Sequence, residues 1–348
     1  MTSGDLLGHN GDRIRPDRNL ALEMTRVTES AAIAASRWMG RGDLKAADGA
    51  AVDAMRFTLS TVAMDGVVVI GEGEKDEAPM LYNGERIGDG SLPAVDVAVD
   101  PIDGTRPTAF GRGGALSVIA IAERGTMFDP GPCFYMNKLA VGAEAVGRVS
   151  IEASVQENLC EIARAKRSSV GELTAIVLDR PRHEDLIEEI RIAGARIRLI
   201  PDGDVAGAIA TAWPESGADV LFGIGGTPEG VITAAALKGM GGELQGKLAP
   251  RDEAERRRVV ASGLDPDAVL SLDDLVDSDN CFFAATGITD GELLHGVRYT
   301  NVGAITQSLV VRSQSGTVRF ISAYHRLEKM RQYHLIDVGP EGPGEAMG

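Results

Sequence analysis

Hydrophobic residues in the first part of this chain recur with the period of helices. Apolar positions at spacings of three and four over residues 20–38 predict an amphipathic helix. A second helix is predicted from about Ala47, and its apolar face consists of Val52, Met55, Leu59 and Val62. Asp48 falls in the first turn of this predicted helix, where an acidic residue ordinarily offsets the helix dipole.

Short apolar runs then predict strands. Residues 67–70 form one such run, and residues 115–123 form another. Between them, the sequence V-D-V-A-V-D alternates with the period of two that is typical of a strand. We expect this strand to stop at Asp100-Pro101, because proline cannot donate a hydrogen bond to a neighbouring strand. Asp103-Gly104 then predicts a turn.

Helix and strand patterns alternate from residue 156 onwards, which predicts βαβ units with parallel strands. The successive segments are 159–165, 175–178, 186–192, 197–200, 205–213 and 220–224. A further strand (281–286) and a hairpin (308–312 with 318–323) follow. The prediction is therefore an α/β protein with four parts: a flexible N-terminal arm (1–17), an N-terminal α/β region (18–150), a C-terminal α/β region (151–335) and a disordered tail (336–348).

Composition narrows the functional classes. The formal net charge of −16 argues against a nucleic-acid-binding surface, because a phosphate backbone would be repelled. The three cysteines are far apart and show no metal-binding or disulfide spacing, which is typical of a reducing compartment. No signal peptide and no apolar run long enough to span a bilayer is found. We therefore expect a cytoplasmic protein that contacts neither nucleic acid nor membrane.

Acidic side chains gather where two predicted strands end. Asp100, Asp103 and Thr105 follow one strand, and G-E-G-E-K-D-E (71–77), which includes Glu72, follows the preceding one. An acidic turn is often only turn chemistry or solvated surface. Two acidic strand ends in succession nevertheless make a cation site plausible, since close carboxylates repel unless a proton or cation lies between them. Magnesium suits such a site, because it binds a few carboxylates together with water and substrate phosphate.

Polar residues also follow three strands of the second region. The first junction, D-R-P-R-H (179–183), offers two arginines that could bind a phosphate. The second, P-D-G-D (201–204), offers acceptors for sugar hydroxyls and a predicted N-cap at Asp204. In the third, G-I-G-G-T-P-E-G (223–230), Thr227 is predicted to cap a helix with Glu229 in its first turn. The glycines do not match the dinucleotide-binding pattern, which disfavours an oxidoreductase.

The string D-P-I-D-G-T (100–105) resembles the signature of the inositol monophosphatase and fructose-bisphosphatase superfamily. The similar D-x-D-G-T motif of haloacid-dehalogenase-type phosphatases has one residue between its aspartates rather than two, so the register does not suit an aspartyl-phosphate mechanism. Longer strings resemble class II fructose-1,6-bisphosphatase of the bacterial GlpX type over about residues 18–325. They are R-V-T-E-S-A-A (26–32), G-R-G-D (40–43), A-D-G-A-A-V (47–52), V-I-G-E-G-E-K-D-E-A-P-M-L-Y (69–82), P-D-G-D-V-A (201–206) and G-I-G-G-T-P-E-G-V (223–231).

This resemblance implies roles for individual residues. The metal-binding carboxylates of the family match Asp48, Glu72, Asp100, Asp103 and Glu229. The segment that contacts the reacting phosphate matches Asp103, Gly104 and Thr105. Other substrate-binding positions match Tyr135, Arg180, Pro181, Arg182, Asp202, Gly203, Asp204 and Gly226. The family implies the layered α/β/α/β/α sugar-phosphatase fold, two or three Mg²⁺ or Mn²⁺ ions per active site, and a homo-oligomer, either a dimer or a tetramer.

The implied reaction is hydrolysis of the 1-phosphate of fructose 1,6-bisphosphate to fructose 6-phosphate, a step of gluconeogenesis, without a phosphoenzyme. Asp48, Asp100 and Thr105 are the expected catalytic residues, and Thr105, hydrogen-bonded to Asp48, would orient the attacking water. Two enzymatic alternatives remain: a sedoheptulose-1,7-bisphosphatase, or another phosphomonoesterase such as an inositol-phosphate phosphatase. A non-catalytic regulator that binds a metal or a sugar phosphate is the alternative from a different class, although a sensor does not need a water-orienting hydroxyl.

Overall fold

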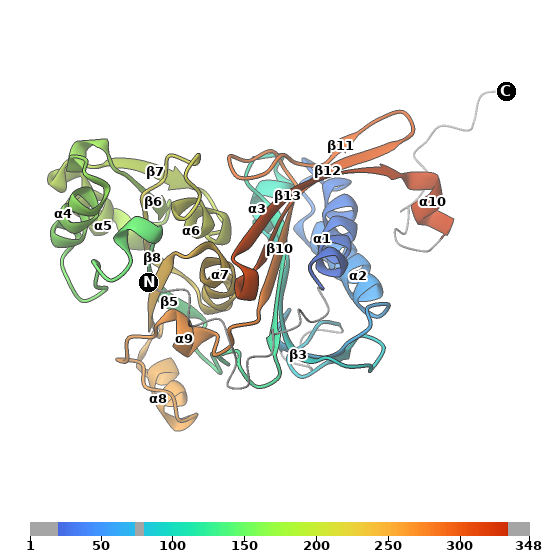
Figure 1. Ribbon diagram of the computed structural model, residues 1–348, viewed down its shortest axis with the longest axis horizontal. Helices are drawn as coiled ribbons and strands as arrows, with labels where there is room; N and C mark the ends of the chain where they lie inside the picture. The colour runs from blue at the N-terminus through green and yellow to red at the C-terminus, as the bar shows by residue number, and fades with distance from the viewer. Residues whose placement is uncertain (1–19, 74–79, 333–348) are drawn as a thin grey trace, which may run out of the picture.

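The computed structural model describes residues 20–73 and 80–332 as two β-sheets with covering helices (Figure 1). The helices are α1 (Ala21–Ser36), α2 (Leu44–Leu59), α3 (Thr105–Ala109), α4 (Val155–Lys166), α5 (Glu184–Ala193), α6 (Val205–Thr211), α7 (Thr227–Met240), α8 (Glu253–Ala261), α9 (Leu272–Leu275) and α10 (Leu327–Gln332). None of the helices in these described ranges is both long and apolar enough to cross a membrane. The predicted arm, the predicted tail and the acidic residues Glu74, Asp76 and Glu77 lie outside the described residues.

The first sheet has eight strands in the order β11-β12-β10-β4-β3-β1-β2, and β13 also pairs with β12. Its strands are β1 (Asp65–Ile70), β2 (Arg86–Ile87), β3 (Ala94–Asp103), β4 (Leu116–Glu123), β10 (Phe282–Gly287), β11 (Arg298–Tyr299), β12 (Gly303–Arg312) and β13 (Thr317–Arg326). The predicted hairpin is confirmed, because β12 and β13 pair antiparallel with Arg312 opposite Thr317.

The second sheet has five strands in the order β7-β6-β8-β5-β9. They are β5 (Tyr135–Val141), β6 (Thr174–Leu178), β7 (Arg196–Ile200), β8 (Val220–Gly226) and β9 (Glu243–Leu248). The predicted parallel pairing is confirmed for β6 with β7 and for β6 with β8, whereas β5 runs antiparallel to both of its neighbours. Strand β5 thus joins the second sheet from before residue 150, and β10 to β13 return to the first. The boundary near residue 150 stays a prediction.

The elements stack in layers, which confirms the predicted α/β/α/β/α arrangement. Figure 1 shows α1 and α2 on the outer face of the first sheet, α6 and α7 between the sheets, and α4 and α5 beyond the second sheet. A hydrophobic core fills each interface between layers. The buried strand β3 serves two of these cores, since Val97 and Val99 face the helices α1 and α2 while Ala98 faces the central layer.

Three local predictions are wrong for identifiable reasons. Strand β3 does not stop at Asp100 but continues to Asp103, because an extra residue is accommodated as a bulge in its pairing with β4. Helix α2 begins at Leu44, and Asp43 caps it by accepting from the backbone N–H of Ala46, so Asp48 is not in the first turn. Likewise, Gly226 rather than Thr227 is the N-cap of α7.

Candidate active site

Asp100 and Asp103 lie on either side of the bulge in β3, close to where the sheet meets the central helices. The Oδ1 atom of Asp100 accepts a hydrogen bond from the backbone N–H of Ile102 at 3.0 Å, which forms a tight turn around Pro101. Gly104 follows with a φ of 104°, a conformation that favours glycine. The bulge and the turn leave the two carboxylates close enough for the charge of Asp103 to raise the pKa of Asp100.

Asp103 is only 2 % exposed, and its Oδ2 atom is buried without a hydrogen-bond partner. The junction that follows β7 closes over it, because a Cβ atom added to Gly203 would lie 2.7 Å from Oδ1 of Asp103. Asp103, at the end of β3 in the first sheet, and Gly203, in the junction after β7 of the second sheet, therefore lie directly against each other. A buried carboxylate oxygen that lacks a protein partner is an unsatisfied acceptor, and a cation would satisfy it.

The predicted metal-binding carboxylates form one acidic group. Burial, and then the charges of Asp103, Glu229 and Glu72, raise the pKa of Asp100. Burial also raises the pKa of Asp103, followed by the charges of Asp204, Glu229 and Asp202. Because each carboxylate disfavours the ionisation of its neighbours, a divalent cation would relieve the group as a whole.

The outer members of this acidic group are Glu72 and Asp48. Burial and the neighbouring charge of Asp48 raise the pKa of Glu72 to about 7, and burial raises the pKa of Asp48. Oxygen donors of this kind fit Mg²⁺ or Mn²⁺. Across the described residues, however, no three His, Cys, Asp or Glu side chains are close enough together to hold a metal ion as they stand. The donors are thus gathered without a closed coordination shell.

Glu229 stands in the first turn of α7, as predicted, and its carboxylate folds back onto the backbone of Gly226. A Cβ atom at Gly226 would lie 1.8 Å from Oε2 of Glu229, so no side chain larger than hydrogen is compatible with this arrangement. Burial raises the pKa of Glu229, Lys138 lowers it, and Asp204 raises it again. In the pair Gly225-Gly226, the second glycine is therefore required because the carboxylate of Glu229 lies close to its Cα atom, and not because the backbone turns there.

The two predicted phosphate-binding arginines are held by different partners. The guanidinium of Arg180 forms an ion pair of 2.5 Å with Asp202 and also donates to the carbonyl of Pro201. Arg182 donates twice to the carbonyl of Ile224, at 3.1 and 2.7 Å, and lies 5.0 Å from the ring centre of Tyr135. Two predicted substrate-binding residues thus lie beside the arginines: Asp202 beside Arg180 and Tyr135 beside Arg182. Pro181 is the first residue of the 3₁₀ turn Pro181–His183, which follows Arg180 and contains Arg182.

Thr105 is half-buried at the start of α3. Its hydroxyl donates to the carbonyl of Ile102 at 3.3 Å, rather than to Asp48 as expected. This hydrogen bond is long, so Thr105 can exchange it for one to a water molecule or a phosphate oxygen at little cost.

Two residues of the site were missed from the sequence. His183 joins the first and third junctions, because its Nδ1 atom lies 2.8 Å from the carbonyl of Leu178 and its Nε2 accepts from the N–H of Ile224 at 2.8 Å. Lys138 on β5 forms an ion pair with Asp204 and is almost wholly buried. A lysine in the otherwise apolar run from residue 138 to 141 was the available signal for the second residue.

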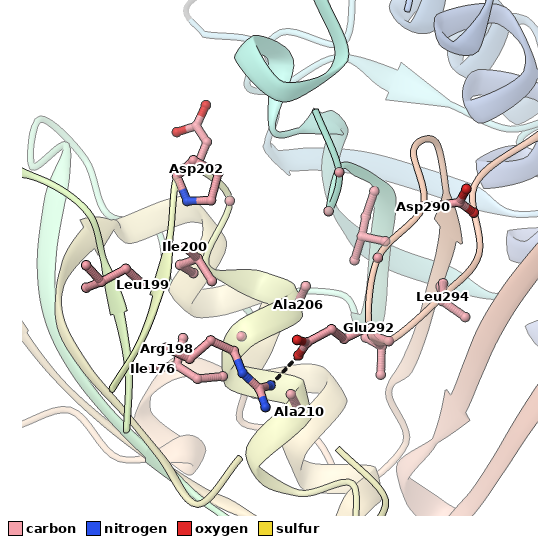
Figure 2. A pocket seen from close by; sticks show the side chains of 18 residues that line it. Ile176, Arg198, Leu199, Ile200, Asp202, Ala206, Ala210, Asp290, Glu292 and Leu294 are labelled. Atoms are coloured by element: carbon pink, nitrogen blue, oxygen red, sulfur yellow. Dashed lines mark ion pairs between the residues drawn. The ribbon is translucent and has the colours of Figure 1, made fainter. Parts of the chain in front are cut away.

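A cleft of about 270 Å³ adjoins the site at Asp202 and Gly203. Its walls are largely apolar, and Figure 2 shows Arg198 from β7 facing Glu292 from the loop after β10 across it. These two side chains form an ion pair that links the surroundings of the two sheets. The cleft thus opens beside the junction that covers Asp103.

Known proteins resemble this chain over almost its full length. The family model for bacterial, glpX-encoded fructose-1,6-bisphosphatase matches residues 18–325. Three curated proteins are each 46 % identical to it over 335 residues, which is 92 % of this chain and 99 % of each relative. They are fructose-1,6-bisphosphatase 1 class 2 of Escherichia coli (strain K12) and the fructose-1,6-bisphosphatases class 2 of Escherichia coli O6:H1 (strain CFT073) and Shigella flexneri.

Proposed function

This chain belongs to the bacterial, glpX-encoded family of class II fructose-1,6-bisphosphatases, which act in gluconeogenesis, and we propose that the acidic group between its two sheets is the active site. The activity itself follows from identity of 46 % over 92 % of the chain. The observation that supports the site is the proximity of five carboxylates, whose charges act on one another from Asp48 through Glu72 and Asp100 to Asp103 and Glu229, together with the buried, unpartnered oxygen of Asp103.

The family is generally metal-dependent. We propose that Asp48, Glu72, Asp100, Asp103 and Glu229 hold two or three Mg²⁺ or Mn²⁺ ions. Such ions, when bound, neutralise phosphate charge and lower the pKa of the attacking water. The fit rests on the donor chemistry and on the raised pKa values of all five carboxyls. Burial raises each of them and neighbouring carboxylates raise all but that of Asp48, and a bound cation would favour the ionised forms.

Within this proposal, the chain's own groups orient the substrate. The segment Asp103, Gly104 and Thr105 receives the 1-phosphate, and the hydroxyl of Thr105 leaves its weak bond to Ile102 in order to align the attacking water. The positive φ of Gly104 lets the backbone turn close to the phosphate, where a Cβ atom would approach Ala115 at 3.3 Å.

The far end of the substrate would meet the second sheet. Arg180 or Arg182 binds the 6-phosphate, because a guanidinium matches phosphate with two parallel hydrogen bonds. The sugar hydroxyls donate to the carboxylates of Asp202 and Asp204, and the backbone of Gly203 and Gly226 lies close to the sugar. Binding energy from this unreactive end contributes to orienting the 1-phosphate at the acidic group.

A coupled assay tests which ester is cleaved. Purified protein is mixed with fructose 1,6-bisphosphate and Mg²⁺ or Mn²⁺. Phosphate release is then compared with NADPH formed through phosphoglucose isomerase and glucose-6-phosphate dehydrogenase. Equal amounts of phosphate and NADPH are expected, because only cleavage at the 1-position yields fructose 6-phosphate. Phosphate without NADPH would contradict the proposal. Parallel assays with sedoheptulose 1,7-bisphosphate and inositol phosphates rank the alternative substrates.

We also propose that the protein is a cytoplasmic homo-oligomer. The hairpin β12–β13 and the adjoining β11 expose apolar side chains, with Tyr324 80 % and Val302 70 % accessible. Exposed apolar groups gathered on one hairpin are typical of protein interfaces. Cys133, Cys160 and Cys281 are free thiols, which suits a reducing compartment. Light scattering coupled to size-exclusion chromatography gives the mass of the particle in solution, and a monomer would contradict the proposed homo-oligomer.

A further inference from the structure

A deeply buried charge near the proposed active site belongs to Lys138. It lies on β5, is 2 % exposed, and is among the largest of the fully buried side chains in the described part of the chain. Lysine is almost never buried this completely unless it is paired. The residues around it leave room for it, because a Cβ atom at Gly230 would lie 3.4 Å from Cδ of Lys138.

The ammonium group of Lys138 joins two junctions that meet at the site. Its Nζ atom lies 2.5 Å from Oδ2 of Asp204, which is itself only 5 % exposed, and donates to the carbonyl of Gly226 at 2.9 Å. Asp204 ends the junction after β7, and Gly226 ends β8. One cation on a third strand therefore fixes the positions of both segments.

The backbone is shaped around this ion pair. A Cβ atom at Gly225 would lie 1.8 Å from Oδ2 of Asp204 and 2.9 Å from Nζ of Lys138. The pair thus presses against the Cα atom of Gly225, and a side chain at this position would displace it. Gly225 thus leaves the space that Lys138 and Asp204 occupy, as Gly226 leaves the space that Glu229 occupies.

We propose that Lys138 is a positioning residue for substrate binding, which holds the carboxylate of Asp204 and the carbonyl of Gly226 in the places that the sugar phosphate requires. This inference rests on the proposed function, because it acts through two of the proposed substrate-binding residues. An apolar side chain would ordinarily fill such a buried position without the desolvation cost of a charge. The position of the charge, between two substrate-binding segments, accounts for its presence.

The test compares four proteins: wild type, Lys138→Met, Asp204→Asn and the double variant. Methionine keeps the length of the lysine side chain and removes its charge. For Lys138→Met we expect KM for fructose 1,6-bisphosphate to rise at least about tenfold while kcat changes less than about threefold, since the change affects substrate placement. If Lys138 acts through Asp204, the double variant should have a KM within about twofold of Asp204→Asn alone.

Lys166→Met is the matched control. Lys166 forms an ion pair of the same length, 2.5 Å, with Asp219 at the opposite end of β8. Its loss should lower the melting temperature and leave KM unchanged, as expected of a residue with a purely structural role. If Lys138→Met lowers the melting temperature in the same way without raising KM, Lys138 is structural and the inference is wrong.

The remaining outcomes are also decisive. If Lys138→Met does not fold because Asp204 is left buried without its partner, the double variant is compared with Asp204→Asn. Equal KM values support the inference, and a further tenfold rise in the double variant contradicts it. Hydrolysis by the wild-type protein is measured first in the same assay. A wild-type protein without hydrolysis refutes the proposed function, whereas an active wild type with an unchanged Lys138→Met refutes only the positioning role.

Discussion

Replacing Glu72 with Gln should stabilise the metal-free protein at pH 8. Burial and the charge of Asp48 raise the pKa of Glu72 from its ordinary 4.5 to about 7. At a pH between these two pKa values, Glu72 keeps its proton in the folded protein but has lost it in the unfolded chain, so the unfolding free energy falls as the pH rises. At about 1.36 kcal/mol for each pH unit, the full loss above pH 7 is roughly 3 kcal/mol. Glutamine does not ionise and escapes this loss.

Urea denaturation of the chelator-treated proteins at pH 5 and pH 8 measures the effect. The difference in unfolding free energy between Glu72→Gln and wild type should grow by roughly 3 kcal/mol from the lower to the higher pH. Asp53→Asn, at an exposed position on α2, is the control and should stay within about 0.5 kcal/mol of wild type at both values. Equal pH dependence of Glu72→Gln and wild type would refute the reasoning.

Magnesium should narrow this difference in stability between Glu72→Gln and the wild type. If Glu72 helps to hold a cation, Mg²⁺ at about 100 times its dissociation constant stabilises the wild-type protein by roughly 2.7 kcal/mol at pH 8. Glu72→Gln should gain clearly less, because it lacks one anionic donor. A variant that gains as much as the wild type would show that Glu72 is not a metal ligand.

Three further changes test other parts of the structure. Gly203→Ala should abolish most activity because its Cβ atom would press on the carboxylate of Asp103, whereas Gly217→Ala, at a similar positive φ but exposed, should retain activity in the same phosphate-release assay. Burial raises the pKa of Glu29 to about 7, so the wild-type protein should lose roughly 3 kcal/mol of unfolding free energy between pH 5 and 8. Denaturation of Glu29→Gln should show no such loss. Arg180→Met should raise KM at least about tenfold in steady-state assays with little change in kcat, because it removes a proposed phosphate contact away from the reacting bond.

Much of the fold could be predicted from local patterns. The helical spacing over residues 20–38 reflects a helix whose apolar side packs on the first sheet, and the alternation of valines over residues 95–99 reflects a strand between two cores. Sheet membership was not predictable in this way. Strand β5 pairs with β8 and β9, which are far from it in sequence, and local periodicity carries no information about such partners.

The carboxylates of the site were predictable for a different reason. Acidic residues at strand ends are visible in the sequence, and the structure places Asp103 and Glu229 close enough to raise the pKa of Asp100, and Glu229 close enough to raise that of Asp103. Lys138 was missed because a single lysine in a strand is usually solvated, and its role depends on an ion pair across 66 residues of sequence with Asp204. The bulge in β3 was likewise invisible, since it depends on the register with β4.

The most direct measurement of the central claim is phosphate release from fructose 1,6-bisphosphate by the wild-type protein and by Asp100→Asn, with Mg²⁺ or Mn²⁺ and with chelator. The account predicts metal-dependent release by the wild type. It predicts a loss of roughly 100-fold or more in the variant, because metal stabilisation of the transition state amounts to several kcal/mol. A cooperative melting transition would show that the variant is folded. Near-native turnover by a folded Asp100→Asn, with the same response to metal, would contradict the assignment of this acidic group as the active site.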